Sequence, residues 1–110
     1  MDYLIALAWL YFGHALADLA WQSDWVGNNK NRWYGHKYWW VVLIGHASIN
    51  GAMVFFITGS LILASFETLL HTLIDLFHCE KKYGLLTDQI LHFMCKMLWA
   101  GLWVSGLAIF

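Results

Sequence analysis

Four long apolar segments make up most of the chain and limit what it can fold into. They run approximately over residues 3–22, 38–58, 61–78 and 88–110. A helix rises 1.5 Å per residue, so about 20 residues cross the roughly 30 Å hydrocarbon core of a membrane. The sequence therefore predicts an all-α, polytopic membrane protein. Its four helices are expected to form one antiparallel transmembrane bundle, a single domain over residues 1–110.

The composition agrees with a membrane protein and disagrees with a soluble domain. Of the 110 residues, 61% are hydrophobic, 18% are aromatic and 12% are charged. A soluble domain of this length cannot cover so much apolar surface. The formal net charge of -1 argues against a nucleic-acid partner, which would require a basic patch. Membrane lipids are the expected surroundings.

The basic residues predict the orientation of the chain in the membrane. Lys30, Arg32 and Lys37 lie in the first connection, and Lys81 and Lys82 lie in the third. The N-terminus, the short second connection and the C-terminus carry neither lysine nor arginine. Because basic loops stay on the cytoplasmic side, both longer connections are expected in the cytoplasm and both termini outside.

Each apolar segment carries two polar residues four positions apart. The pairs are His14 and Asp18, His46 and Asn50, His71 and Asp75, and Asp88 and His92. Residues four apart share one face of a helix. Because neighbouring helices run in opposite directions, all four pairs fall in the cytoplasmic half of the bundle. The sequence therefore predicts that the pairs face one another in its interior.

This polar set is typical of a metal site. An ionisable group in hydrocarbon costs about 2.5 to 3.5 kcal/mol even on mild scales, so these groups must satisfy one another or a shared ligand. Imidazoles and carboxylates bind transition metals, and helix bundles hold such sites. We predict one or two divalent ions, zinc foremost, with manganese or iron as alternatives. The candidate ligands are His14, Asp18, His46, His71, Asp75, Asp88 and His92.

Several polar residues have a second interpretation. Glu67 and Lys96 continue the polar faces one turn deeper, and a buried ion pair is one interpretation. In the other, Glu67 is a bridging metal ligand or general base and Lys96 binds an anion. The ion pair is the simpler interpretation. Asp88 would equally cap the fourth helix. His36 and His78, in a loop or at a helix end, are expected to be solvated.

The motifs, taken in order, resemble a known family. "GHALADLAWQSDWVGNNK" at 13–30, "GH" at 45–46, "HTLID" at 71–75 and "DQILH" at 88–92 are similar to the small phage and bacterial membrane proteins grouped as domain of unknown function 3307. The resemblance covers nearly the whole chain and implies a place in the bacterial inner membrane, but no established activity. A more distant resemblance is to inner-membrane metal-dependent hydrolases. Where the family leads us to expect a second histidine shortly after His46, the chain has Asn50, a poorer ligand.

Three functions are compatible with these features. The first is a membrane-embedded metal-dependent hydrolase with Asp18, Asp88 or Glu67 as general base. Its substrate would be a lipid head group, a lipid-linked phosphate or another amphiphile. The second is a divalent-cation or proton transporter, for which four short helices would need to form a homodimer. The third is a phage or bacterial membrane factor with a structural metal, which binds a host protein through the aromatic, basic segment 25–40.

Overall fold

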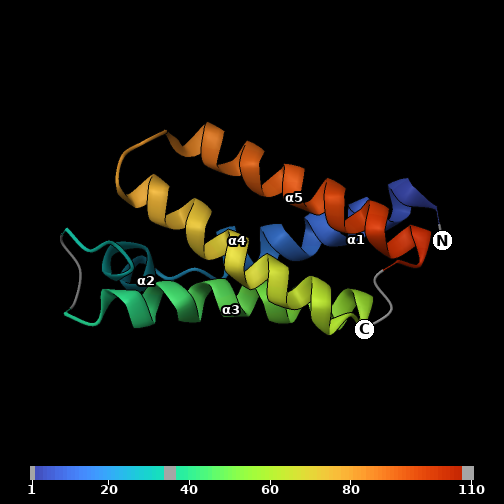
Figure 1. The fold of residues 1–110 in the computed structure, drawn as a ribbon. Coiled ribbons are helices and arrows are strands. Elements are labelled where there is room, and N and C mark those ends of the chain that lie inside the picture. Colours follow the sequence, from blue (N-terminus) through green and yellow to red (C-terminus); the bar gives the residue numbers. More distant parts are fainter. Residues whose placement is uncertain (1, 34–36, 108–110) are drawn as a thin grey trace.

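The computed structural model describes residues 2–33 and 37–107, and all regular structure in these ranges is helical (Figure 1). The elements are α1 (Tyr3–His14), the π-helical segment η1 (Ala15–Ala20), α2 (Asp24–Asn29), α3 (Trp39–Thr58), α4 (Leu61–Cys79) and α5 (Leu85–Ser105). The predicted all-helical class is confirmed. The short helix α2 and the π-helical segment were not predicted from the sequence.

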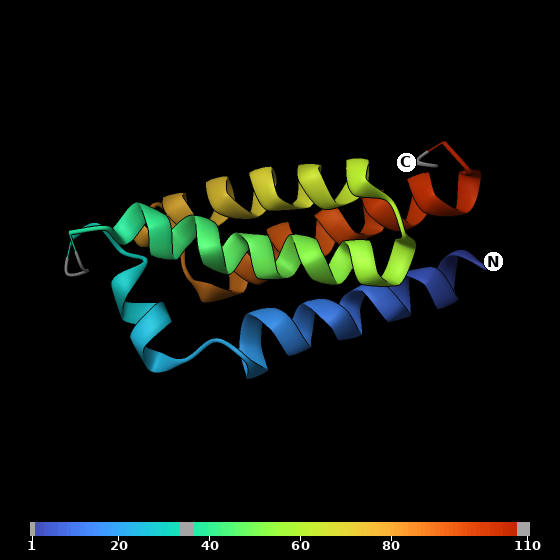
Figure 2. The ribbon, with the colours of Figure 1, turned by 90° about the horizontal axis from the view of Figure 1, so that it is seen from below.

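The four long helices run antiparallel along a molecule that measures 43 × 24 × 21 Å (Figures 1 and 2). Both α1 and α4 pack against α3 and α5, so each long helix has two neighbours around a shared interior. The turn between α3 and α4 lies at the same end as the start of α1 and the end of α5, which we call the terminal end. The opposite end, formed by α2 and the connection at 80–84, we call the loop end.

Caps and a glycine fix the turn between α3 and α4, where the sequence predicts one. Gly59, with φ of 72°, ends α3 in the left-handed conformation that glycine adopts without strain. Ser60 then begins α4, because its hydroxyl oxygen accepts a hydrogen bond of 3.1 Å from the backbone N–H of Leu63. The two helices are thereby placed side by side.

A second glycine allows α3 and α4 to approach closely. A β-carbon at Gly51 would lie 2.9 Å from the backbone oxygen of Ala64 and would also clash with the side chain of Thr68. The backbone of α3 therefore packs directly on α4 at this point. Because of this close contact, the polar faces of α3 and α4 lie next to each other nearer the loop end.

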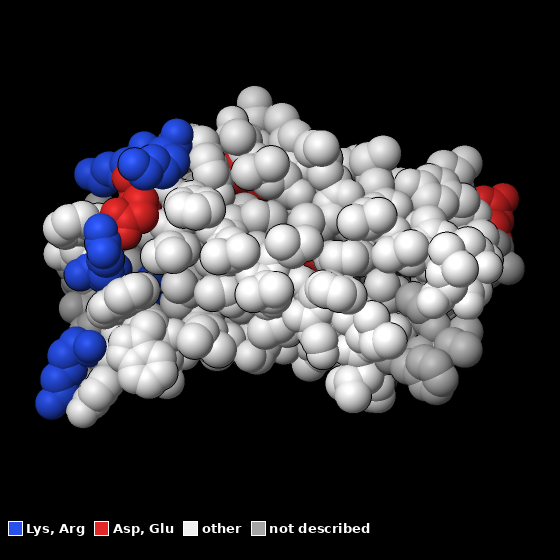
Figure 3. Space-filling model, in the orientation of Figure 1, with Lys and Arg blue, Asp and Glu red and all other residues white. Residues whose placement is uncertain are grey.

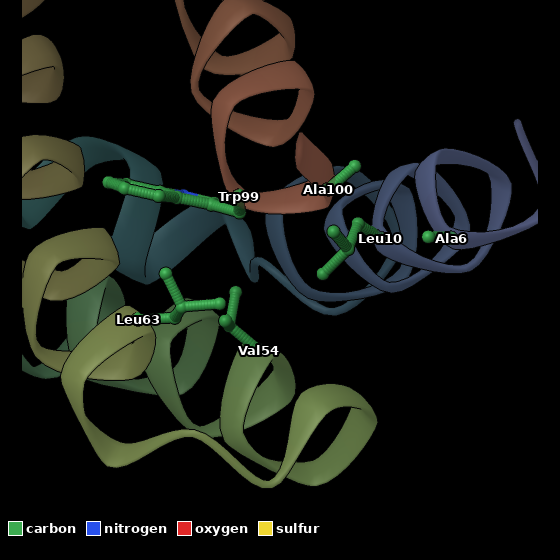
Figure 4. Close-up of a cluster of buried hydrophobic side chains, with 6 residues drawn as sticks. All are labelled: Ala6, Leu10, Val54, Leu63, Trp99 and Ala100. Carbon is green, nitrogen blue, oxygen red and sulfur yellow. The ribbon is translucent and has the colours of Figure 1, made fainter. Parts of the chain in front are cut away.

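The interior is apolar in the half nearer the terminal end. Its buried cluster, drawn in Figure 4, consists of Ala6, Leu10, Val54, Leu63, Trp99 and Ala100. The other half of the interior is polar. Trp99 joins the two, because its indole N–H donates a hydrogen bond of 3.0 Å to Glu67. The candidate site therefore lies between an apolar core and the loop end.

Three segments are long and apolar enough to cross a membrane, namely Tyr3–Ala20, α3 and α4. Within the described ranges, α5 does not reach the same hydropathy, although the sequence predicts it as a fourth span. Figure 3 shows the exposed lysine and arginine side chains gathered at the loop end, with a broad uncharged surface between the two ends. The exposed basic residues thus lie at one end of the molecule, while Lys96 is buried in the interior.

The start of α5 differs from the prediction. The helix begins at Leu85, with Gly84 at the N-cap position, and not at Asp88. Asp88 therefore lies one turn inside the helix. The interpretation of Asp88 as the cap of this helix is wrong, and its side chain points to the interior instead, where it is 5% exposed.

Candidate metal centre

All seven predicted ligands are buried and lie together in the polar half of the interior. Their exposed fractions are 5% or less, and the residues are His14, Asp18, His46, His71, Asp75, Asp88 and His92. They come from α1, η1, α3, α4 and α5. Three of the four predicted polar pairs, and His46 of the fourth, therefore converge in the structure.

Asp18 joins the histidines of two other helices. Its Oδ1 atom lies 2.8 Å from Nε2 of His46 and 3.2 Å from Nε2 of His71. Asp18 belongs to η1, where the backbone N–H of Trp21 bonds the carbonyl of Leu16 five residues earlier. Single π-helical turns of this kind occur frequently at functional sites.

Asp75 contacts three histidines from the opposite side. Its Oδ2 atom lies 3.3 Å from Nε2 of both His46 and His71, and its Oδ1 atom lies 3.0 Å from Nε2 of His92. The rings of His71 and His92 are adjacent, with centroids 4.1 Å apart. Two carboxylates and three imidazoles thus present their polar atoms to one small volume.

Two overlapping groups of these side chains can hold a metal ion. One consists of His14, His71 and His92, and the other of Asp18, His71, Asp75 and His92. Within each group the ligand atoms all lie within 4.8 Å of one another. Ligand atoms on a single ion with bonds near 2 Å lie at most about 4 Å apart, so small side-chain movements would complete the coordination.

The charges also favour a cation here. Four buried carboxylates face only two ammonium groups, which leaves a formal charge of −2 when the imidazoles are neutral. The groups are Asp18, Glu67, Asp75 and Asp88 against Lys30 and Lys96. Uncompensated charge in an interior is costly. One divalent ion would balance this excess.

Glu67 contacts the ring nitrogen of His71 that faces away from Asp18 and Asp75. Its Oε2 atom lies 3.1 Å from Nδ1 of His71, while its Oε1 atom accepts from Lys96 at 2.5 Å and from Trp99 at 3.0 Å. The predicted ion pair of Glu67 and Lys96 is therefore present. The contact with His71 is additional, and it has the geometry by which a carboxylate orients a metal-binding imidazole. Nε2 of His71 faces Asp18 and Asp75, and it is the ring atom that would bind an ion.

Gln89 connects three groups of the site. Its amide nitrogen donates 3.0 Å hydrogen bonds to Oδ2 of Asp18 and to Oδ2 of Asp88. Its amide oxygen lies 3.0 Å from Nε2 of His14. Gln89 thus fixes carboxylates from two helices at a defined separation.

Asp88 keeps one oxygen available. Its Oδ1 atom is buried and receives no hydrogen bond from the described residues. It lies 3.5 Å from Nε2 of His92 and 3.6 Å from Nδ1 of His78. His78, expected to be solvated, is so only in part, because its side chain is one-third exposed and its Nδ1 atom is buried. His36 lies outside the described residues.

A pocket of about 310 Å³ connects the site to the loop end. Asp18, Asp75 and Asp88 line it, and so do Lys30 and His78. The site is therefore buried within the helices and still reachable from the loop end. A space of this size and polarity is suited to a small polar group.

Lys30 is a site residue that the sequence did not reveal. Its ammonium group lies 2.9 Å from Oδ2 of Asp75 and 2.7 Å from the side-chain oxygen of Gln22. The segment that follows α2 is fastened to the end of α4, where Asn31 donates to the carbonyl of Cys79 at 3.3 Å. The sequence does indicate where α2 begins, because Ser23 is a typical N-cap residue. Its hydroxyl oxygen accepts a hydrogen bond from the backbone N–H of Val26.

Asn50 takes no part in the metal-binding groups. Its amide nitrogen donates to the backbone oxygen of His46 at 3.2 Å. Its side-chain oxygen is buried and has no hydrogen-bond partner among residues 2–33 and 37–107. α3 therefore contributes His46 alone to the cluster.

Beside the site, outside the long helices, burial and the nearby carboxylates of Asp88 and Asp75 raise the pKa of Tyr83 to about 12. The phenol is therefore protonated at neutral pH, and it donates a hydrogen bond to the carbonyl of Ile74 in α4. This bond fastens the connection between α4 and α5 next to the pocket.

Comparison with known proteins places the chain in a family without assigning an activity. Residues 6–109 match the family described as "Protein of unknown function (DUF3307)". No curated protein and no solved structure matches the chain. The more distant resemblance to metal-dependent hydrolases thus has no support from these comparisons. The match covers nearly the whole chain, and the protein belongs to the DUF3307 family.

Proposed function

We propose that the protein is a metal-dependent hydrolase embedded in the bacterial inner membrane, with four transmembrane helices and both termini outside. Three apolar segments support the membrane assignment, and α5 would complete the return across the bilayer despite its buried Asp88 and Lys96. The basic loop end fits the cytoplasmic side. The site would then lie inside the cytoplasmic leaflet.

The observation that carries the proposal is the pocket of about 310 Å³ leading from the loop end to Asp18, Asp75 and Asp88. A hydrolase needs its metal ligands to be reachable by substrate from one side. A transporter needs a polar path through both halves. Toward the terminal end, however, the described interior is closed by Leu10, Leu63 and neighbouring apolar side chains. This favours the hydrolase over the transporter.

Different side chains would bind the metal, accept the proton and position the base during hydrolysis. Asp18, His71, Asp75 and His92 would hold the ion, which lowers the pKa of a bound water and polarises the bond to be cleaved. Asp88 lines the pocket, and its Oδ1 receives no hydrogen bond from the described residues. It would accept a proton from the attacking water. The water oxygen bonds to the phosphorus or acyl carbon, the ester bond breaks, and Asp88 returns the proton to the departing oxygen. Gln89 keeps the carboxylate of Asp88 in place.

Asp88→Asn tests this assignment. It removes the base but keeps a side chain that still contacts Gln89, so metal content should be unchanged while kcat falls by about 10² to 10⁴. The measurement is turnover of p-nitrophenyl phosphate, bis-p-nitrophenyl phosphate and p-nitrophenyl acetate by metal-loaded, detergent-purified protein. Asp24→Asn, an exposed carboxylate of α2, is the matched control. A wild type that binds metal and hydrolyses none of these esters, or an Asp88→Asn variant with full turnover, would contradict the proposal.

A further inference from the structure

We infer that the site binds an amphiphile, with its phosphate head group in the polar pocket and one hydrocarbon chain in a separate groove between α2 and α3. This inference rests on the proposed function and adds the class of substrate. It follows from two neighbouring hollows that are both lined by Gln22.

The groove has a volume of about 270 Å³ and is lined mainly by apolar side chains. They come from η1, the connection at 21–23, α2 and α3, and they are Ala17, Trp21, Trp25, Val26, Val42 and Ile49. Trp21, Trp25 and Ile49 are each more than half exposed on the outside of the molecule. In a bilayer this surface would face lipid, so a chain could enter the groove sideways without crossing water.

The groove and the polar pocket lie next to each other and share one lining residue. Gln22 lines both of them. His46 lines the groove, and its Nε2 atom lies 2.8 Å from Asp18, which lines the polar pocket. A molecule whose polar and apolar parts are joined could therefore place one part in each hollow. This shared wall distinguishes the groove from an ordinary gap between surface helices.

Lys30 indicates the chemistry of the head group. Its ammonium lies in the polar pocket, bound to Gln22 and to Asp75, a candidate metal ligand. A metal ion on Asp75 would compete for the same carboxylate and leave Lys30 to bind an anion. Lysine is a common phosphate-binding residue, and the carboxylates of the pocket would repel such an anion until the metal neutralises them. A phosphate monoester or diester fits both conditions.

Gly45 offers a way to fill the groove without disturbing the fold. It lines the groove, and a β-carbon added there meets nothing within 4 Å. Gly45→Leu would therefore occupy the space of the hydrocarbon chain, while Leu is also the better helix former. Ser48→Leu is the matched control, since Ser48 is exposed on the same helix and does not line the groove.

The experiment measures binding of dioleoyl phosphatidate in mixed micelles and of inorganic phosphate by metal-loaded protein. We expect Gly45→Leu to weaken phosphatidate binding about 10- to 100-fold and to leave phosphate binding and metal content unchanged. Ser48→Leu should behave as wild type. Lys30→Gln should weaken both ligands, and Lys30→Arg should restore them.

Two results would overturn the inference. One is phosphatidate binding by Gly45→Leu equal to wild type, and the other is an equal loss in Gly45→Leu and Ser48→Leu. Failure of the proposed function would give a different experimental result. Wild-type protein that binds phosphatidate in a manner sensitive to Gly45→Leu, but hydrolyses no ester, would keep the binding site and refute the hydrolase.

Discussion

At the scale of single residues, His71 is the centre of the site. Its Nε2 atom faces Asp18 and Asp75 at 3.2 and 3.3 Å, and its Nδ1 atom lies 3.1 Å from Glu67. The spacing of Glu67, His71 and Asp75 along α4 was enough to predict that they share a face. The sequence could not show that Glu67 contacts His71 as well as Lys96, because both contacts depend on side-chain rotamers.

Glu67→Gln should weaken the metal site without touching a ligand. The amide cannot supply the negative charge that orients His71 and makes its imidazole more basic, so the Kd for metal should rise about 10- to 100-fold. Metal affinity is measured by competition with a chromophoric chelator, with Asp24→Asn as the control carboxylate. Unchanged affinity in Glu67→Gln would show that Glu67 only neutralises Lys96.

At the scale of helices, sequence patterns fixed where the long elements lie but not their irregularities. Apolar length and the Thr58–Gly59–Ser60 turn predicted α3 and α4 to within one residue. The π-helical turn at Ala15–Ala20 was missed, because a hydrogen bond to the fifth residue leaves no mark in hydrophobic periodicity. α2 was missed because a six-residue helix is decided by its tertiary contacts and not by its propensity.

Two glycines of α3 should respond in opposite ways to the same substitution. Gly51→Ala places a methyl group against the backbone of Ala64, so it should lower the free energy of unfolding by about 1 to 3 kcal/mol. Gly45→Ala meets open space and should raise it by up to about 1 kcal/mol through helix propensity. Thermal unfolding in one detergent measures both variants. Equal effects would mean that α3 and α4 are not in close contact at Gly51.

At the scale of the whole molecule, the buried polar site lies between the apolar core (Figure 4) and the basic loop end (Figure 3). The convergence of the polar pairs could be predicted because successive helices reverse direction. The pocket, Lys30 and His78 could not, because they depend on how the two connections fold over the end of the bundle. No spacing rule links residue 30 to residue 75.

The proposed topology has a direct consequence for labelling. In a Cys79→Ser, Cys95→Ser background, Leu107→Cys should react with a membrane-impermeant maleimide in intact cells, after outer-membrane permeabilisation. Asn28→Cys in α2 should react only after the inner membrane is opened. Both positions are exposed in the structure, so burial does not confound the comparison. Reaction of Asn28→Cys alone in intact cells would reverse the orientation.

The metal content of the detergent-purified protein is the most direct test of the central claim, that the buried histidines and aspartates hold a metal. Protein purified without chelator and loaded in turn with zinc, manganese and iron is measured by mass spectrometry, beside His71→Ala, Asp75→Ala and the control Asp24→Ala. We predict about one or two equivalents of one metal in the wild type and the control, and loss in the two site variants while they remain folded and monodisperse. No bound metal in folded wild-type protein would contradict the account and leave these residues as a hydrogen-bonded network.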